Sequence, residues 1–427
     1  MSFASPAVGS ATAEVVRHVL PNGVRVVVMR DRAAPMVAAR AVWSGGRRRE
    51  PDELGGVSRV LALAWTGGCG ERDAAELAGE LVADGASMLG FAGRDTMGLQ
   101  AEWTRSGWEQ GFELLADCVA GPRFAPDAIG RGRERAADLA AQRGRHPTWA
   151  ALDLLDRRML GVEPVGSLER IDSAGLLDHY RVHYPVSAMT LAFVGDVDPA
   201  RVLDRVRARF GGSPRQRRPD ASPAARTDSD RELYRHLPGD SGVAAVALGF
   251  EAVGRAHSDR AALEIAAALI GARAELVADA EAGYLAAHRV CPVEHLPAEL
   301  DGLRRAIARL HDPGPSEAEV RRAASRLAEA RGLALARAPR AAALLALYEV
   351  LGPGAEHATR HADRLRAVRA ADVRAAAERY LTPESAVVAT AMPMVASPEV
   401  IRRARGVVRP GKKAPRPRAR KRARRRR

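Results

Sequence analysis

Two histidine pairs at helical spacing are the residues most suited to metal chemistry. His179 and His183 lie four residues apart in the segment HYRVH, and His357 and His361 lie four apart in HATRH. Histidines at this spacing share one face of a helix, where two imidazoles could bind zinc. Neither pair has a glutamate between its histidines to act as general base. We therefore interpret both pairs as surface or capping histidines.

The cysteines give no second candidate. Cys69, Cys118 and Cys291 are far apart and show none of the short spacings of zinc or disulfide sites, so they are interpreted as small buried thiols. The glycine-rich turn around Cys69 could expose a nucleophile, but a plain loop is the favoured interpretation. The sequence contains no phosphate-binding GxxxxGK[ST] and no GxSxG nucleophile motif.

The charge of the chain is concentrated at its end. The 427 residues carry 66 Lys+Arg and 52 Asp+Glu, a formal net charge of +14. Residues 401–427 hold 15 of the basic residues and no acid, which leaves 51 basic against 52 acidic residues in 1–400. The body is therefore expected to be a near-neutral globular protein with a basic tail.

The tail is predicted to be disordered and to attract polyanions through counterion release. It has no aromatic residue that could stack on bases. Nucleic acid, an anionic surface and an acidic protein all remain candidates, as does a tail without a dedicated partner. The basic residues singled out for polyanion binding are Arg402, Arg403, Lys412, Lys413, Arg420, Lys421, Arg422, Arg424, Arg425, Arg426 and Arg427.

Hydrophobic periodicity predicts alternating strands and helices in the first part of the chain. An Asn-Gly turn at 22–23 precedes the first strand, and Asp73 is the expected N-cap of a helix. Strands are predicted at 24–29, 37–43, 86–91, 96–102 and 190–194. Helices are predicted at 56–64, 73–84, 106–119, 127–143, 148–160, 172–183 and 199–210.

A similar order of elements then follows a segment with linker composition, which suggests internal duplication. The predicted strands are 233–236, 243–250 and 385–391, and the predicted helices are 259–270, 300–309, 316–336, 340–351 and 371–380. The expected fold class is α+β, with two domains that each pack helices on an antiparallel-rich sheet. The expected division is a disordered 1–14, a domain over 15–212, a polar linker over 213–230, a second domain over 231–395 and a disordered 396–427.

Three segments resemble the pitrilysin/insulinase family of zinc metallopeptidases, M16. Residues 20–58 resemble its first hairpin and glycine turn, 176–199 (LLDHYRVHYPVSAMTLAFVGDVDP) its helix–strand element, and 367–390 its closing helix and strand. The resemblance covers about 15–395 and is closest to the smaller, two-domain members. It implies two homologous α+β domains, often in a pair of chains that enclose a peptide-binding chamber.

The resemblance also implies a zinc site that this chain lacks. The family binds zinc through His-x-x-Glu-His on one helix and a further Glu downstream. Here Arg59 matches the first His, Ala62 the general base and Leu63 the second His, and the distal position falls at Leu139, or at Asp138 if the register moves by one. Arginine stays protonated, and alanine and leucine offer no donor atom. We therefore expect neither a metal nor another cofactor.

A substrate-holding pair found in some non-zinc members is also expected to be absent. The resemblance places Asp279 and Ala286 where those members have an Arg and a Tyr, and Tyr284 is near but out of register. Between Leu285 and the helix at Leu300 there is room for one strand, where the family usually has a strand pair.

These observations favour a non-catalytic subunit, or a peptide-binding scaffold, that pairs with an active zinc peptidase of the same family. One alternative is a docking module whose basic tail binds nucleic acid or acidic partners. Another is a metallopeptidase with relocated ligands drawn from Asp138, His146, His179 and His183. No apolar stretch of the ~18 residues that a membrane span needs is present, and no secretory signal is seen. A cytoplasmic location is therefore expected.

Overall fold

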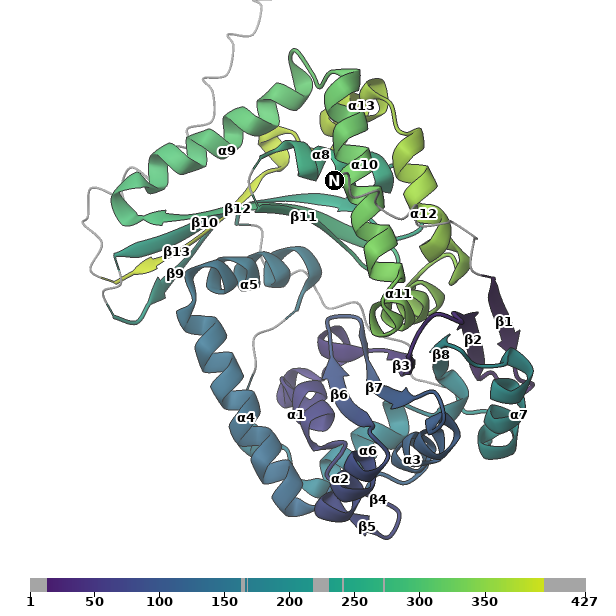
Figure 1. Cartoon of the computed structure of the whole chain (residues 1–427). Coiled ribbons are helices and arrows are strands. Elements are labelled where there is room, and N and C mark those ends of the chain that lie inside the picture. Colours follow the sequence, from purple (N-terminus) through teal and green to yellow (C-terminus); the bar gives the residue numbers. More distant parts are fainter. Residues whose placement is uncertain are drawn as a thin grey trace, which may run out of the picture.

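The computed structural model describes residues 14–162, 166, 168–217, 230–239, 242–271 and 273–394. Two mixed α/β halves lie one above the other, and each is built on one sheet (Figure 1). The sheet of the N-terminal half has the order β1-β2-β8-β3-β7-β6, and that of the C-terminal half has the order β11-β12-β10-β13-β9. These sheets confirm the expected α+β fold with two similar parts.

The strands of the first sheet are β1 (Val15–Val19), β2 (Arg25–Arg30), β3 (Met36–Ser44), β6 (Ser87–Ala92), β7 (Thr96–Thr104) and β8 (Thr190–Gly195). Those of the second are β9 (Glu232–Leu237), β10 (Val243–Val253), β11 (Arg273–Ala278), β12 (Ala282–Pro292) and β13 (Val387–Pro393). A small ribbon pairs β4 (Gly68–Cys69) with β5 (Arg72–Asp73).

The helices of the N-terminal half are α1 (Val57–Ala64), α2 (Ala74–Ala83), α3 (Trp108–Ala120), α4 (Pro126–Arg145), α5 (Pro147–Leu160), α6 (Ser173–His183) and α7 (Pro199–Phe210). Those of the C-terminal half are α8 (Arg260–Leu269), α9 (Leu296–His311), α10 (Glu317–Leu335), α11 (Ala338–Leu351), α12 (Glu356–Ala367) and α13 (Ala370–Tyr380). Short 3-10 turns are η1 (Gly46–Arg49), η2 (Asp52–Leu54), η3 (Leu168–Arg170), η4 (Val186–Ala188), η5 (Val293–His295) and η6 (Pro383–Ser385).

The two halves repeat one topology, which is the physical sign of a duplication. The order β2-β8-β3-β7-β6 corresponds strand by strand to β9-β13-β10-β12-β11. The pairs β2–β8 and β9–β13 are parallel, and the remaining pairs in both series are antiparallel. The first sheet differs by its added edge strand β1.

Each half lends one helix to the sheet of the other. α5 packs on β9, β10, β12 and β13, whereas α11 packs on β3, β7 and β8 (Figure 1). Both sheets are therefore covered on two faces, which explains why the central strands β8 and β13 are buried along their whole length. The expected linker at 213–230 lies between the two sheets in the sequence. It assigns α5 to the N-terminal part and α11 to the C-terminal part, although each helix packs on the sheet of the other part.

Several details differ from the sequence expectations. The strand β1 and the helix α12 were not predicted, and β11 was missed. One strand, β12, continues past Leu285 as expected, but the strand pair is present nevertheless, because β11 and β12 form an antiparallel hairpin that begins earlier, at Arg273. Its turn contains neither glycine nor proline and is closed by the Asp279 carboxylate, which accepts the backbone N–H groups of Glu281 (3.0 Å) and Ala282 (2.7 Å).

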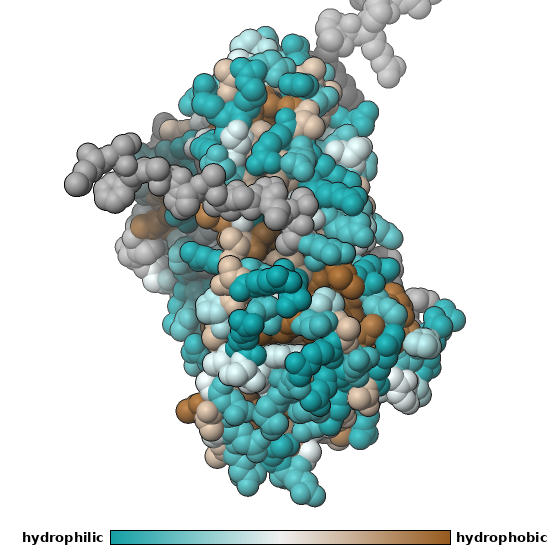
Figure 2. Space-filling model, turned by 45° about the vertical axis from the view of Figure 1, so that its right-hand side comes forward, coloured by the Kyte–Doolittle hydropathy of each residue, from teal (hydrophilic) through white to brown (hydrophobic). Residues whose placement is uncertain are grey.

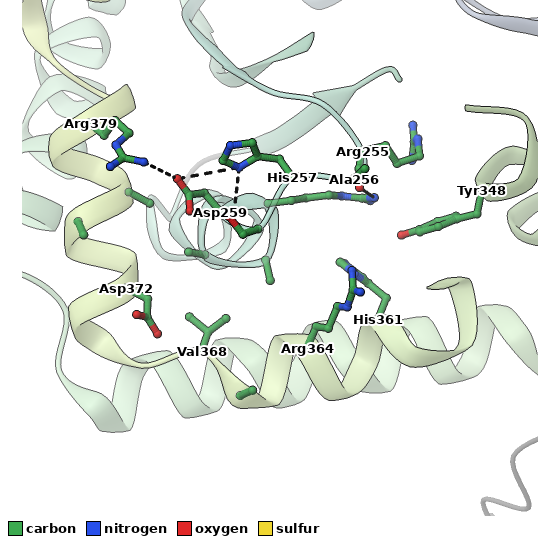
Figure 3. Close-up of a pocket in the computed structure, with 17 residues that line it drawn as sticks. Arg255, Ala256, His257, Asp259, Tyr348, His361, Arg364, Val368, Asp372 and Arg379 are labelled. Atoms are coloured by element: carbon green, nitrogen blue, oxygen red, sulfur yellow. Dashed lines mark hydrogen bonds and ion pairs between the residues drawn. The ribbon is translucent and has the colours of Figure 1, made fainter. Parts of the chain in front are cut away.

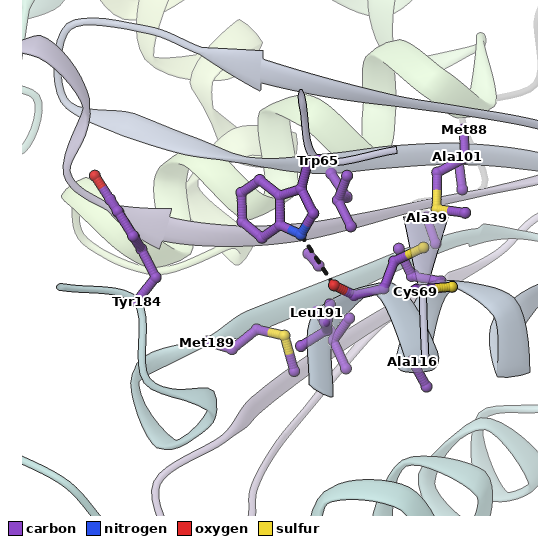
Figure 4. Packing of buried hydrophobic residues seen from close by; sticks show 14 of the residues in the cluster. Ala39, Trp65, Cys69, Met88, Ala101, Ala116, Tyr184, Met189 and Leu191 are labelled. Atoms are coloured by element: carbon purple, nitrogen blue, oxygen red, sulfur yellow. Dashed lines mark hydrogen bonds between the residues drawn. The ribbon is translucent and has the colours of Figure 1, made fainter. Parts of the chain in front are cut away.

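The core of the N-terminal half is rich in aromatic side chains (Figure 4). Trp65 donates its indole N–H to the Cys118 carbonyl oxygen at 3.0 Å, and its ring lies 5.6 Å from that of Trp43. Cys69, Cys118 and Cys291 are free and buried, as expected. A hydrogen bond with Cys69, followed by burial, raises the pKa of the Cys118 thiol. The same hydrogen bond lowers the pKa of the Cys69 thiol, but all three thiols are buried away from solvent and serve as packing residues.

Close packing in this core predicts a strong effect at Gly111. A Cβ atom there would lie 2.0 Å from two atoms of the Trp103 ring, which is fully buried. We expect Gly111→Ala to lower the free energy of unfolding by about 1–3 kcal/mol, as measured by urea denaturation. Gly130→Ala in α4 is the control, since nothing lies within 4 Å of its Cβ, and it should raise stability by about 0.5–1 kcal/mol. Equal effects would contradict the packing argument.

Candidate functional site

The helix α1 is held at its start by a carboxylate. Glu50 accepts the backbone N–H groups of Gly56 at 2.7 Å and Ser58 at 3.0 Å. Gly56 has φ 99°, a conformation that favours glycine, and places the chain for the first helical turn. Burial raises the pKa of Glu50, and these hydrogen bonds oppose the rise. The sequence after the glycine turn thus fixes α1 at a defined place beside the sheet.

The positions that the M16 resemblance marks for zinc lie on two neighbouring helices. Arg59, Ala62 and Leu63 are on α1, Leu139 is on α4, and the two helices pack together. Arg59 is half-buried, Ala62 is buried and Leu63 is 37% exposed. The two helices are therefore neighbours, but these side chains offer no lone pair to a metal.

The charge around Arg59 also opposes a cation. Burial lowers the pKa of Arg59, and the nearby charges of Arg47 and Arg143 lower it further. Glu50 and Asp153 act in the opposite direction, but Asp153 is bound by Arg143 at 2.8 Å. Three guanidinium groups thus share this region with two carboxylates. The net electrostatic attraction for a divalent cation is therefore small there. The residues present do not fit zinc.

The alternative ligand set is not assembled. Asp138 is exposed on α4, His146 immediately precedes α5, and His179 and His183 are on α6. Within the described ranges no group of three or more His, Cys, Asp or Glu side chains is placed to hold a metal.

The interpretation of all four paired histidines as surface or capping residues is wrong for two of them. His179 is 6% exposed, and its ring centroid lies 4.5 Å from that of His183. His361 is 3% exposed, and its Nε2 lies 2.7 Å from a Glu264 carboxylate oxygen. Helical periodicity places such residues on a face but does not say whether another element covers that face.

His179 should make stability depend on pH. Burial, and then the charge of His183, lower the pKa of His179 to about 3. Below its ordinary pKa of about 6.5 the unfolded chain binds a proton that the folded chain refuses, so stability falls as the pH drops from about 6.5 towards 3. Between pH 7 and pH 5 this loss is about 2 kcal/mol. His179→Phe should remove that part of the pH dependence in urea unfolding; an unchanged dependence would contradict the assignment.

A buried acid joins the two halves, and the sequence analysis missed it. Asp156 of α5 accepts hydrogen bonds from Arg47 (3.1 Å) and the Tyr284 hydroxyl (2.6 Å) and forms an ion pair with Arg94 (2.8 Å); its side chain is 1% exposed. Arg47 and Arg94 belong to the N-terminal half, whereas α5 and Tyr284 pack in the C-terminal half. We call these four residues the seam cluster. The sequence did contain a signal for this cluster. Asp156 lies with Leu152, Leu155 and Met159 on the apolar face of a predicted helix, where an acid needs a buried partner.

The positions expected to replace the substrate-holding pair are structural. Asp279 closes the β11–β12 turn and forms an ion pair with Arg48, which also binds Asp95 at 3.1 Å. Ala286 is buried in the core under α5. Tyr284, which is near the family's Tyr position in sequence, is fully buried and donates its hydroxyl to Asp156. None of these side chains is free to hold a peptide.

The basic tail residues from Arg402 to Arg427 lie outside the described residues, as do most of the predicted linker and the first 13 residues. In the part of the chain that is described, no helix is both long and apolar enough to cross a membrane.

Comparisons with known proteins agree with this architecture. An uncharacterised zinc protease of Mycobacterium leprae is 27% identical over 225 residues, which cover 51% of this chain and 50% of that protein. A probable mitochondrial-processing peptidase subunit beta of Arabidopsis thaliana is 27% identical over 202 residues, covering 45% of this chain and 38% of that protein. The chain thus spans about half, or less, of the length of these curated relatives.

The fold is shared with a solved protease from Helicobacter pylori, at a TM-score of 0.78 and 15% identity over 89% of this chain and 100% of that one. The family model "Insulinase (Peptidase family M16)" matches residues 25–166, and "Peptidase M16 inactive domain" matches residues 170–327. The two matches follow one another along the sequence and together cover most of the chain. The chain therefore belongs to peptidase family M16.

Proposed function

We propose that this chain is a non-catalytic M16 subunit, which binds unfolded peptide and pairs with a zinc-containing peptidase of the same family. The observation that supports the proposal is the residue set on α1: where the resemblance places the family's His, Glu and His, this chain has Arg59, Ala62 and Leu63. A catalytic zinc needs three protein ligands and a base beside its bound water. With Leu139 at the distal position, this site supplies none of them.

The edge strand β6 is the surface that we assign to the peptide. It ends the first sheet, with no strand beyond it among the described residues. Its Leu89 side chain is 57% exposed, and Gly90 packs so closely on α1 that a Cβ would lie 1.9 Å from the Ala62 carbonyl oxygen. An exposed edge strand can pair with an extended peptide through its backbone, and a nearby apolar side chain can add contact. The peptide would then lie beside the helix that carries zinc in active relatives.

The partner chain is proposed from the relatives and from the missing ligands together. The Arabidopsis relative is named as a subunit of a processing peptidase. A scaffold without its own ligands can contribute to hydrolysis only if another chain supplies the zinc. Hydrophobic residues on the face shown in Figure 2 gather near the middle of the molecule, where the two halves meet, while the surface towards its ends is mostly hydrophilic.

Peptide binding is tested with a fluorescent unstructured peptide and the full chain. Leu89→Lys should weaken binding by about tenfold, because an edge lysine removes the apolar contact and discourages strand pairing. Val82→Lys is the matched control, since Val82 is also exposed (78%) but lies on α2, and it should bind as the unaltered chain does. Equal affinities for the two variants would reject the β6 assignment. Co-purification from the native host tests the partner, and a lone monomer without an M16 partner would count against pairing.

A second candidate function rests on the charge of residues 401–427. A docking module that uses this tail would bind polyanions with an affinity that falls steeply with salt. Truncation at about residue 400 should then abolish binding to a DNA duplex while leaving peptide binding intact. If the truncated chain binds DNA unchanged, the tail is not the cause.

A further inference from the structure

A cavity of about 650 Å³ opens in the C-terminal half (Figure 3). Residues before and within α8 form one side, α12 and α13 form the other, and Tyr348 of α11 closes one end. This volume is in the range of small-molecule sites, about 300–1,000 Å³. The lining residues used below are Arg255, Arg260, Tyr348, Arg364, Val368 and Ala375.

Arginines surround the closed end of this cavity. The Tyr348 ring is 1% exposed, and the guanidinium carbons of Arg255, Arg260 and Arg331 lie 5.7, 5.2 and 5.5 Å from its centroid. Arg331 also donates to the Tyr348 hydroxyl at 3.1 Å. The aromatic face helps to hold the three cations close together, so this end of the cavity carries a concentrated positive charge.

The carboxylates nearby are already engaged. Glu264 is bound by Arg260 at 2.8 Å and by His361 at 2.7 Å. Asp259 is bound by Arg379 at 3.2 Å and by the Tyr380 hydroxyl at 2.9 Å. The remaining lining acid, Asp372, is exposed and accepts the backbone N–H of Arg369 at 2.9 Å as part of the α13 cap. These acids therefore do not neutralise every arginine of the cavity.

Two arginines of the lining, Arg255 and Arg364, form no ion pair with a carboxylate of the described residues, although the charges of Asp95 and Glu264 act on Arg255. Within the described residues, Arg255 donates through Nη2 to the Ala278 carbonyl oxygen, while its buried Nε has no hydrogen-bond partner. Arg364 is exposed on α12 and forms no ion pair with a described residue. Figure 3 shows its side chain rising beside His361 towards the α8 side of the cavity. An anion placed between these groups would give both charges a partner.

The rest of the wall is mostly small and apolar. Its apolar part consists of Val368 and six alanines, namely Ala256, Ala261, Ala262, Ala367, Ala375 and Ala376, while His257 and Ser258 add polar groups before α8. Such a wall leaves room for a compact apolar group, and the arginines fix its orientation from one end.

We propose that this cavity binds a small organic anion, with a phosphate or carboxylate head between Arg255, Arg260 and Arg364 and an apolar body along the alanine wall. The site is independent of the proposed peptide function. Its residues come from 255–262, 348 and 361–379, far from α1 and β6 in the sequence.

The test uses the full chain, isothermal titration calorimetry, and phenyl phosphate, benzoate and inorganic phosphate as probes. Arg364→Ala should weaken phenyl phosphate binding about tenfold, because it removes a charge-assisted hydrogen bond. Arg366→Ala is the control, since Arg366 is on the same helix but pairs with Asp363 at 3.0 Å and does not line the cavity. The unaltered chain and both variants contain residues 401–427, so any binding of the probe to this basic segment contributes equally to each measurement. Equal binding by both variants would overturn the proposal.

A second pair of variants tests the apolar body. Ala375→Phe fills the cavity from α13, whereas Ala371→Phe alters the same helix at an exposed position outside the lining. Ala375→Phe should weaken phenyl phosphate binding about tenfold and leave inorganic phosphate within about twofold. Ala371→Phe should change neither. Unaltered phenyl phosphate binding by Ala375→Phe would show that the anion binds elsewhere and overturn the proposal. Tighter binding of benzoate than of phenyl phosphate would support a carboxylate head, and the reverse a phosphate head.

Discussion

Replacing Asp156 with alanine should lower the free energy of unfolding by about 3–5 kcal/mol. The Asp156 carboxylate is 1% exposed, accepts hydrogen bonds from Arg47 and Tyr284, and forms an ion pair with Arg94. Its removal leaves two arginines and a buried hydroxyl without their partner, and the desolvation cost of those groups is then uncompensated. Because these residues come from both halves, the loss should appear as a destabilisation of the whole chain in urea or thermal unfolding.

The matched control is an exposed acid in an ion pair. Asp363 binds Arg366 at 3.0 Å on α12, with side chains 80% and 54% exposed. Pairs of this kind contribute little because water screens them, so Asp363→Ala should leave stability nearly unchanged. If Asp156→Ala were as mild as this control, the seam cluster would not hold the two halves together.

Restoring the family's ligands should create a zinc site. The changes Arg59→His, Leu63→His and Leu139→Glu place three donor side chains on α1 and α4, which pack together. They also remove one of the guanidinium groups that oppose a cation there. We expect about one zinc per chain after loading and gel filtration, since three protein ligands with an open fourth position hold a catalytic zinc.

The control for this variant keeps the positive charge. A chain with only Leu63→His and Leu139→Glu has two ligands and still carries Arg59, so it should retain far less zinc. Zinc retention that is no higher in the triple variant than in this double variant would show that the three positions do not converge. The correspondence with the family's zinc positions would then be wrong.

Much of the fold was predictable because local signals and tertiary packing agree. Asp73 caps α2 as expected, with a reciprocal bond to Glu76. After Thr190, β8 is continuously apolar, and so is the buried part of β10. The helix α12 was missed because its sequence, EHATRHADRLRA, has few apolar residues. The β11 strand was missed because an aspartate side chain, and not glycine, closes its turn.

The exchange of α5 and α11 could not be read from the sequence. Periodicity identifies the buried face of a helix, but it does not identify the sheet that covers this face. For the same reason the seam cluster could not be predicted. Asp156 contacts Arg47 and Tyr284 only because α5 packs on the second sheet. The arginine-lined cavity combines residues from three separate segments for the same reason. The assignment of Arg59, Ala62 and Leu63 to the family's zinc positions, by contrast, rests on the resemblance of residues 20–58 and the helix after them to the M16 family.

The zinc content of the unaltered chain tests the central claim most directly. Protein purified without chelators would be measured by plasma mass spectrometry and assayed against an unstructured peptide with and without a chelator. The residues on α1 and α4 predict less than about 0.1 zinc per chain and no chelator-sensitive cleavage, since they supply no metal donor. One zinc per chain, together with cleavage that a chelator abolishes, would contradict a non-catalytic subunit.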